Sequence, residues 1–277
     1  MKLFPSLTNR LKSTLNLCFS RNLNGRKIKI PLINGIKVGL GNEKWMSQVI
    51  VKVMNVSGGD TFWDVGANLG QTLIKLKTLD SSWHYVGFEP NPTCVYYIQE
   101  LIKKNSFSKT TIFPVGLFLE NTILELETFG NDADPLGSII PNFRKSRPNS
   151  SKKWVPLFSS SAIEEKIPVS NVDIVKIDAE GAEFEVLQTL KSLIVDKRPV
   201  VLIEILPVYK KENSSRFISQ KKIEALFKEI DYSIFRINKK NGEFDGFAQI
   251  NEIGIHGELN MCDYLVCPTE KAKSFNF

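Results

Sequence analysis

The chain has 277 residues, of which 42% are hydrophobic and 24% charged, enough to form one large α/β domain with a packed core. These values exclude an intrinsically disordered, collagen-like or coiled-coil protein. The formal net charge is +6, and no apolar run approaches the roughly 18 residues of a membrane-spanning helix, so we expect a soluble, cytoplasmic protein.

The positive charge is concentrated at the amino terminus. Eight lysine and arginine residues precede Glu43, the first acidic residue, and the rest of the chain carries 28 basic against 30 acidic side chains. Because the body is slightly acidic, we expect no nucleic-acid partner. Residues 1–57 are interpreted as a basic segment that is helical and packs on the domain. Contact with an anionic membrane surface or a partner through residues 1–30 is the second interpretation.

From residue 58 to residue 277 we predict one domain built from βαβ units, because short apolar runs alternate with helical patterns. The patterns favour helices opening at Asn91 and covering 183–195 and 219–230. A polar, partly basic stretch at about 129–166 has neither pattern, and we interpret it as a substrate-facing insertion. Seven strands are predicted, at 61–65, 85–88, 111–115, 172–177, 200–205, 232–237 and 264–267.

The first of these strands ends in a glycine-bearing turn, with the sequence DVGANLG from Asp64 to Gly70. Gly66 and Gly70 allow the backbone to approach a ligand closely, and the following helix offers free N–H groups. The pattern is GxNxG rather than the GxGxxG of dinucleotide-binding proteins. A carboxylate at Asp64 would repel the pyrophosphate of NAD, whereas it suits the α-ammonium group of S-adenosylmethionine.

The second strand ends at Glu89, which follows Asp64 by 25 residues (89 − 64). A carboxylate at that strand end has two oxygens, one for each hydroxyl of a ribose. Two acidic residues in this order on consecutive strands therefore predict a site for an adenosine-containing cofactor.

The fourth strand leads into VKIDAEGAE, which places Asp178, Glu180 and Glu183 just beyond its carboxyl end. Together with DVGANLG and FEPNP, this run resembles the FkbM family of S-adenosylmethionine-dependent methyltransferases over roughly residues 60–205. The resemblance implies an α/β, Rossmann-like, seven-stranded, mostly parallel sheet of the class I methyltransferase type, with helices on both faces. A terminal hairpin would insert an antiparallel strand into this sheet.

The resemblance also implies methylation of a hydroxyl on a sugar, glycan or secondary metabolite, so the expected partner is a small-molecule or glycan acceptor. Carried onto this chain, it places the methionine part of the cofactor beside the glycine turn, the ribose at Glu89 and the adenine near residues 115–117. The implied cofactor-binding residues are Asp64, Gly66, Asn68, Gly70, Glu89, Pro90 and Gly116.

Methyl transfer to a hydroxyl needs a group that removes the hydroxyl proton. Asp178 is the first candidate for this base, followed by Glu180 and by Glu204 at the end of the fifth strand. Alternatively, these three carboxylates hold a divalent metal that lowers the pKa of the hydroxyl. An RNA methyltransferase, an NAD-binding oxidoreductase and a non-catalytic binding module remain as alternative functions.

Overall fold

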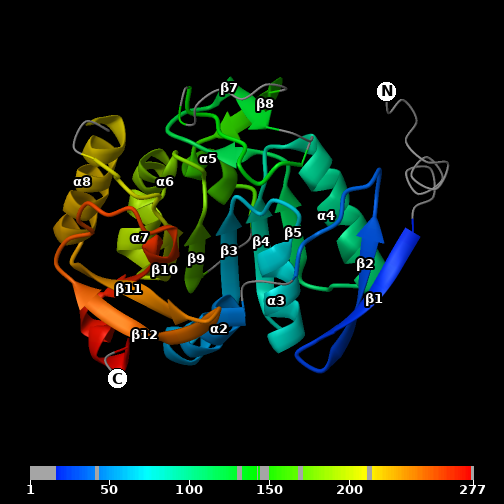
Figure 1. Ribbon diagram of the computed structural model, residues 1–277, viewed down its shortest axis with the longest axis horizontal. Coiled ribbons are helices and arrows are strands. Elements are labelled where there is room, and N and C mark those ends of the chain that lie inside the picture. The colour runs from blue at the N-terminus through cyan, green and yellow to red at the C-terminus, as the bar shows by residue number, and fades with distance from the viewer. Residues whose placement is uncertain are drawn as a thin grey trace, which may run out of the picture.

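The computed structural model describes residues 17–40, 44–129, 133–141, 143, 150–167, 171–210 and 214–275. Its centre is a large, mostly parallel sheet with helices on both faces (Figure 1), which confirms the predicted α/β class. The elements in chain order are β1 (Leu17–Leu23), β2 (Arg26–Leu32), α2 (Lys44–Ser57), β3 (Thr61–Val65), α3 (Gln71–Leu79), β4 (His84–Phe88), α4 (Pro92–Asn105), β5 (Thr110–Phe113), β6 (Gly116–Leu117), β7 (Thr122–Phe129), β8 (Ser150–Phe158), α5 (Ser160–Glu164), β9 (Ile174–Ile177), α6 (Glu183–Thr189), α7 (Lys191–Lys197), β10 (Val200–Glu204), α8 (Ser214–Glu229), β11 (Tyr232–Lys240), β12 (Glu243–Ile250), η1 (Leu259–Met261), β13 (Asp263–Pro268) and η2 (Thr269–Phe275).

The central sheet has the strand order β12-β11-β13-β10-β9-β3-β4-β5. All seven predicted strands lie in it, and β12 adds an eighth strand at one edge that the sequence did not reveal. Strands β5, β4, β3, β9 and β10 run parallel to one another. Strand β13 lies between β10 and β11 and is antiparallel to both, which confirms the expected antiparallel insertion.

Two hydrophobic clusters attach the helices to the two faces of the sheet. Helices α2, α3 and α4 pack on one face, where Leu73 and Ile98 are fully buried. Helices α5 to α8 pack on the other face, around Leu187 and Phe227. The predicted helix over 183–195 is in fact two helices that join at Leu190. Within the described ranges, no helix is long and apolar enough to cross a membrane.

Residues 17–32 form a hairpin rather than the predicted helix, and the helical part of the described amino-terminal segment is α2. The hairpin turns at Asn24 and Gly25, whose φ angles of 49° and 76° are those of a two-residue type I′ turn. Strand β2 packs against α4, where the Asn105 amide donates to the carbonyl oxygen of Lys29 and accepts from its N–H, both at 2.8 Å. Residues 1–16 of this segment lie outside the described residues.

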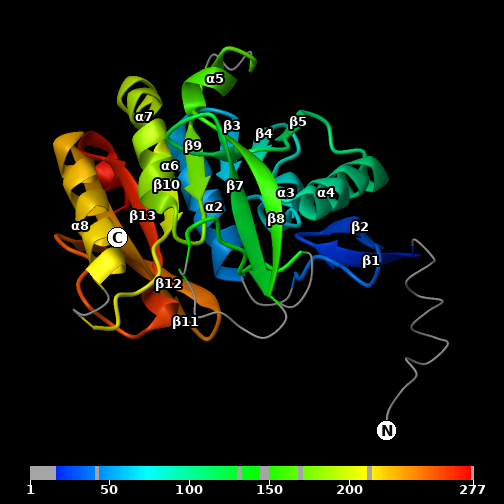
Figure 2. The same ribbon diagram turned by 90° about the horizontal axis from the view of Figure 1, so that it is seen from above.

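The predicted insertion is more regular than the sequence suggested. Strand β8 pairs with β7 and β6 to form a second, three-stranded sheet, and Val155 and Leu157 on β8 are buried. Viewed from above, β7 and β8 lie across the ends of the central strands (Figure 2). The irregular-loop prediction is therefore wrong for 150–158, while the basic residues at 144, 145 and 147 lie outside the described ranges.

Candidate active site

A cavity of about 270 Å³ opens at the carboxyl ends of β3, β4, β9 and β10. This edge is where open α/β sheets bind their ligands. The small sheet closes one side of the cavity with Leu126 and Leu157, and the start of α2 closes another with Trp45 and Met46. Sequence reasoning missed these four wall residues, because they come from elements whose place against the sheet could not be predicted.

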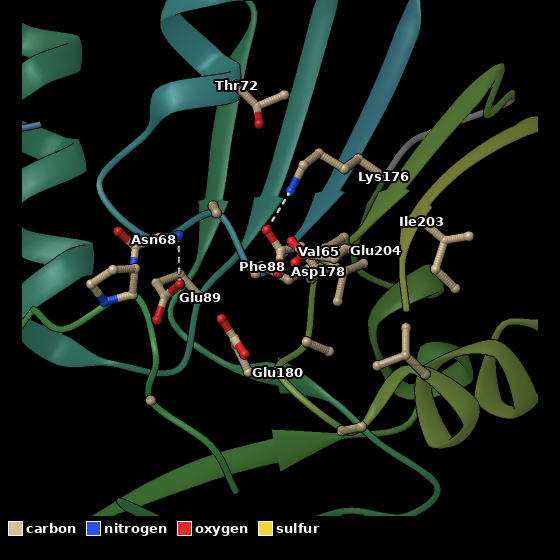
Figure 3. A pocket seen from close by; sticks show the side chains of 18 of the residues that line it. Val65, Asn68, Thr72, Phe88, Glu89, Lys176, Asp178, Glu180, Ile203 and Glu204 are labelled. Atoms are coloured by element: carbon tan, nitrogen blue, oxygen red, sulfur yellow. Dashed lines mark hydrogen bonds and ion pairs between the residues drawn. The ribbon is translucent and has the colours of Figure 1, made fainter. Parts of the chain in front are cut away.

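Eight of the ten predicted site residues line this cavity, and they come from the ends of β3, β4, β9 and β10 and from the start of β6. They are Gly66, Asn68, Glu89, Pro90, Gly116, Asp178, Glu180 and Glu204. The side chains of Glu89, Asp178, Glu180 and Glu204 gather around one space (Figure 3). Asp64 and Gly70 are not part of the lining.

The glycine turn after β3 contacts the ends of the two neighbouring strands, β4 and β9. The N–H groups of Gly66 and Ala67 both donate to the carbonyl oxygen of Phe88, at 3.0 and 3.1 Å. Gly66 has a φ of +85°, and a Cβ there would lie 1.9 Å from the carbonyl oxygen of Asp178. Only glycine fits this position, so the absence of a side chain lets β3, β4 and β9 end close together.

Glu89 is a buried carboxylate that is held by backbone. One oxygen accepts from the N–H of Asn68 at 2.7 Å, and the other accepts from the N–H of Asn91 at 2.8 Å. Burial raises the pKa of Glu89 to about 7, although these two hydrogen bonds oppose the rise. Each oxygen keeps a second acceptor position, so the fixed carboxyl group can take two further donors from a ligand in the cavity.

Asp64 does not face the cavity, contrary to its predicted contact with a ligand's ammonium group. Side chains alternate along a strand, and Asp64 points to the same face as Phe62, beneath the helices. Its side chain is fully buried, accepts from the hydroxyl of Tyr85 at 2.6 Å and lies 3.7 Å from Nζ of Lys176. Burial raises its pKa, and Lys176 partly opposes that effect. The cation beside Asp64 is therefore Lys176 of the protein itself and not the ammonium group of a ligand.

Lys176 is a cavity residue to which sequence reasoning assigned no role. Its ammonium group lies 3.1 Å from Oδ2 of Asp178 and is shared with Asp64. Burial alone would lower the pKa of Lys176, but Asp178 and Asp64 outweigh burial and leave the pKa raised. A signal was present in the sequence, since Lys176 interrupts the otherwise apolar strand β9, and a buried lysine needs an acidic partner.

The remaining wall is acidic. The described lining residues include six acids (Glu89, Asp134, Asp178, Glu180, Glu204 and Asp263) and a single lysine. Glu204 lies opposite Asp263 on β13, and the carboxylate of Asp263 is paired with Lys239. Burial first, then Asp178 and Asp263, raise the pKa of Glu204 to about 9.

Two further residues near this edge have structural partners. Glu183 opens α6 and accepts the N–H of Gly181 at 2.8 Å, and burial raises its pKa to about 7. Nε2 of His256 lies 3.4 Å from the hydroxyl of Tyr264, so His256 lies behind a lining residue rather than in the cavity.

In the part of the chain that the structure describes, no group of three His, Cys, Asp or Glu residues is placed to hold a metal ion. We therefore derive no metal-assisted step.

The comparison with protein families gives one match. The model of the methyltransferase FkbM domain matches residues 64–234, which span the strands from β3 to the start of β11. No curated protein matches the chain significantly.

Three solved structures with a similar fold are distant in sequence. A methyltransferase FkbM from Methylobacillus flagellatus KT is 14% identical with a TM-score of 0.47, over 76% of this chain and 43% of that one. This chain thus spans less than half of that relative. A putative caffeoyl-CoA O-methyltransferase from Staphylococcus aureus is 10% identical with a TM-score of 0.46, over 80% of this chain and 81% of that one. The O-methyltransferase from Bacillus cereus in complex with SAH is 14% identical with a TM-score of 0.44, over 80% of this chain and 79% of that one.

Proposed function

The chain belongs to the FkbM methyltransferase family, and on this basis we propose that it transfers a methyl group from S-adenosylmethionine to a hydroxyl of a sugar, glycan or secondary metabolite. The observation that carries the cofactor assignment is Glu89. A buried carboxylate fixed by two backbone N–H groups at the edge of the cavity is prepared for the two hydroxyls of a ribose.

The rest of the lining fits the same cofactor. The turn at Gly66 and Asn68 lines the cavity, and we place the methionine part of the cofactor beside it. Gly116, Pro90 and Leu157 all line the cavity and lie close together, since a Cβ at Gly116 would be 2.6 Å from Leu157 and 3.4 Å from Pro90. We place the adenine against this wall. Asp178, rather than Asp64, is the carboxylate that lies next to the glycine turn and also reaches the cavity.

The bound cofactor would supply a methyl group on a positively charged sulfur. The task of the chain is to hold the acceptor's oxygen in line with that methyl group and to take up the hydroxyl proton. Asp178 is our first candidate for the proton acceptor, and Glu180 is the next. Glu204 is the weakest of the three, because a pKa raised to about 9 keeps it protonated near neutral pH. All three carboxyl groups line the cavity beside the glycine turn.

An oxidoreductase that uses NAD is not proposed, but the reason differs from the one that the sequence suggested. Asp64 is buried away from the cavity and so exerts little direct repulsion on a pyrophosphate there. The family match and the GxNxG turn are what favour a methyl-transfer cofactor.

Titration calorimetry with S-adenosylmethionine, S-adenosylhomocysteine and NAD tests the assignment. We expect the first two to bind and NAD not to bind. Glu89→Ala should weaken binding of S-adenosylhomocysteine by about 1–3 kcal/mol, since it leaves the ribose hydroxyls without a fixed acceptor. Glu229→Ala, which removes an exposed carboxylate on α8 paired with Lys191, is the matched control and should bind normally. Binding of NAD but not of S-adenosylhomocysteine would contradict the proposal.

A further inference from the structure

Strand β1 presents an unpaired edge. Its seven residues pair with β2 in the register Leu23↔Arg26 to Leu17↔Leu32, and no other described strand lies beside it. In a hairpin with a two-residue turn, the pair that flanks the turn is hydrogen-bonded and the pairs then alternate. The backbone N–H and C=O groups of Cys18, Ser20 and Asn22 therefore point away from β2.

The other edge of the same hairpin has hydrogen-bond partners on α4 at Lys29 and Pro31. On β2, Lys29 exchanges two hydrogen bonds with the Asn105 amide, and the carbonyl oxygen of Pro31 accepts from the hydroxyl of Tyr97 at 2.8 Å. Helix α4 thus covers β2 with side chains that replace a strand. On β1, by contrast, Phe19 is 46% exposed and Leu17 is 36% exposed, and both views place β1 at the outside of the molecule (Figures 1 and 2).

We propose that β1 is a dimerisation edge, and that two copies of the chain join their β1 strands antiparallel across a two-fold axis at Ser20. The two hairpins then form one four-stranded sheet, β2-β1-β1-β2. The pairs Ser20–Ser20, Cys18–Asn22 and Asn22–Cys18 are hydrogen-bonded in this register, so three pairs with two bonds each satisfy all the outward backbone groups of both strands.

The side chains favour a second copy over an unrelated strand, because β1 is complementary to itself in this register. The closely spaced pairs between the hydrogen-bonded ones are Leu17–Leu23 and Phe19–Arg21. Leucine meets leucine, and each guanidinium lies beside a phenyl ring of the other copy rather than beside another guanidinium. The strand contains no proline and no lysine, the residues that commonly protect an exposed edge from pairing.

The mass of the full-length chain in solution tests the proposal, measured by sedimentation or light scattering over micromolar to millimolar concentrations. We expect the mass to rise with concentration towards twice the 31.3 kDa of one chain. Ser20→Pro removes an outward N–H that the hairpin does not use, and it should weaken dimerisation at least about tenfold. Ser20→Ala keeps the N–H and is the matched control, which should dimerise like the unchanged chain.

Cysteine cross-linking tests the register. Cys18 is exposed and the other three cysteines are buried. In the proposed dimer the two Cys18 residues lie about 13 Å apart along the strands, too far for a disulfide. Mild oxidation should therefore leave the unchanged chain uncross-linked. Ser20→Cys in a Cys18→Ser background should give a covalent dimer, because paired Cα atoms about 5.5 Å apart lie within disulfide range.

Two outcomes would overturn the proposal. One is a mass of a single chain at every concentration, which would mean that another segment or another protein covers β1. The other is a dimer that forms equally well with Ser20→Pro, provided that circular dichroism shows the variant to be folded. Cross-linking of the Asn22→Cys variant only when Cys18 is also present would support the proposed register, while equal cross-linking in a Cys18→Ser background would contradict it.

Discussion

The ammonium nitrogen of Lys176 lies 3.1 Å from Oδ2 of Asp178, two residues further along the chain. The same nitrogen is 3.7 Å from Oδ1 of Asp64, which is fully buried. The ammonium group of Lys176 thus pairs with two carboxyl groups, that of Asp178 in the cavity wall and that of Asp64 beneath the cavity. Removal of Lys176 would leave Asp64 as an uncompensated buried charge.

We therefore expect Lys176→Met to destabilise the cofactor-free protein by about 3–5 kcal/mol, the usual cost of breaking a buried ion pair. Chemical denaturation measures this change. Lys152→Met is the control, since Lys152 forms an exposed pair with Glu125 that water screens, and its loss should leave stability almost unchanged. Similar stabilities of the two variants would show that Lys176 is not needed to neutralise Asp64.

A comparison of alanine substitutions at Gly66 and Gly25 separates the effect of backbone conformation on stability from the effect of close packing. Both have positive φ angles, of 85° and 76°, but a Cβ at Gly25 would have no atom within 4 Å, whereas one at Gly66 would clash with the carbonyl oxygen of Asp178. Gly25→Ala should cost about 1 kcal/mol of stability through backbone strain alone. Gly66→Ala should cost several times more and should abolish binding of S-adenosylhomocysteine. Normal binding by Gly66→Ala would show that the turn tolerates a shift away from β9.

Glu204 should make the stability of the protein depend on pH. Its pKa in the folded state is raised from 4.5 to about 9, so the folded protein holds this proton more tightly than the unfolded chain does. The stability that depends on protonated Glu204 is fully present below pH 4.5, the pKa of this side chain in the unfolded chain, and is lost as the pH rises towards 9. Glu204→Gln should therefore be more stable than the unchanged chain at pH 8 by on the order of 1 kcal/mol or more. Thermal melts of the cofactor-free proteins from pH 5 to pH 9 measure the difference, and a constant difference over this range would contradict it.

The candidates for the proton acceptor can be separated by activity. Asp178→Asn keeps the shape of the side chain but removes proton acceptance, so we expect turnover to fall at least about 10²-fold while the affinity for S-adenosylhomocysteine changes little. Methyl transfer to a panel of hydroxylated sugars is the measurement. Near-normal turnover by Asp178→Asn, together with a large loss for Glu204→Gln or Glu180→Gln, would move the assignment to one of those residues.

The sequence predicted the buried strands of the central sheet and missed β1, β2 and β8, of which β1 is exposed and β2 is only partly buried. The seven apolar runs from residue 61 onward stand out because both faces of the central strands are covered. Strand β1 is exposed along almost its whole length. Strand β8 begins with the polar residues SSKK, and its buried residues, Val155 and Leu157, lie near its end, so neither strand shows a periodic pattern over its length.

The site was predicted in outline because parallel strands bring their carboxyl ends to one edge. Glu89 and Asp178 lie beyond the ends of their strands and reach that edge. Asp64 lies inside its strand, where the alternation of side chains decides the face to which it points. A motif that gives the order of residues along the chain does not show which acid reaches a ligand and which is buried beneath it.

The position of β13 also has a consequence for the order of assembly. Strands β10 and β11 have no hydrogen bonds to each other and are joined only through β13, which follows both in the sequence. During synthesis from the amino terminus, β10 and β11 therefore leave the ribosome before the strand that links them exists. A nascent chain that stops short of residue 263 carries an open slot in the middle of its sheet, with two unpaired apolar strand edges beside it. Such a chain is a substrate for chaperones and proteases until the last strand fills the slot.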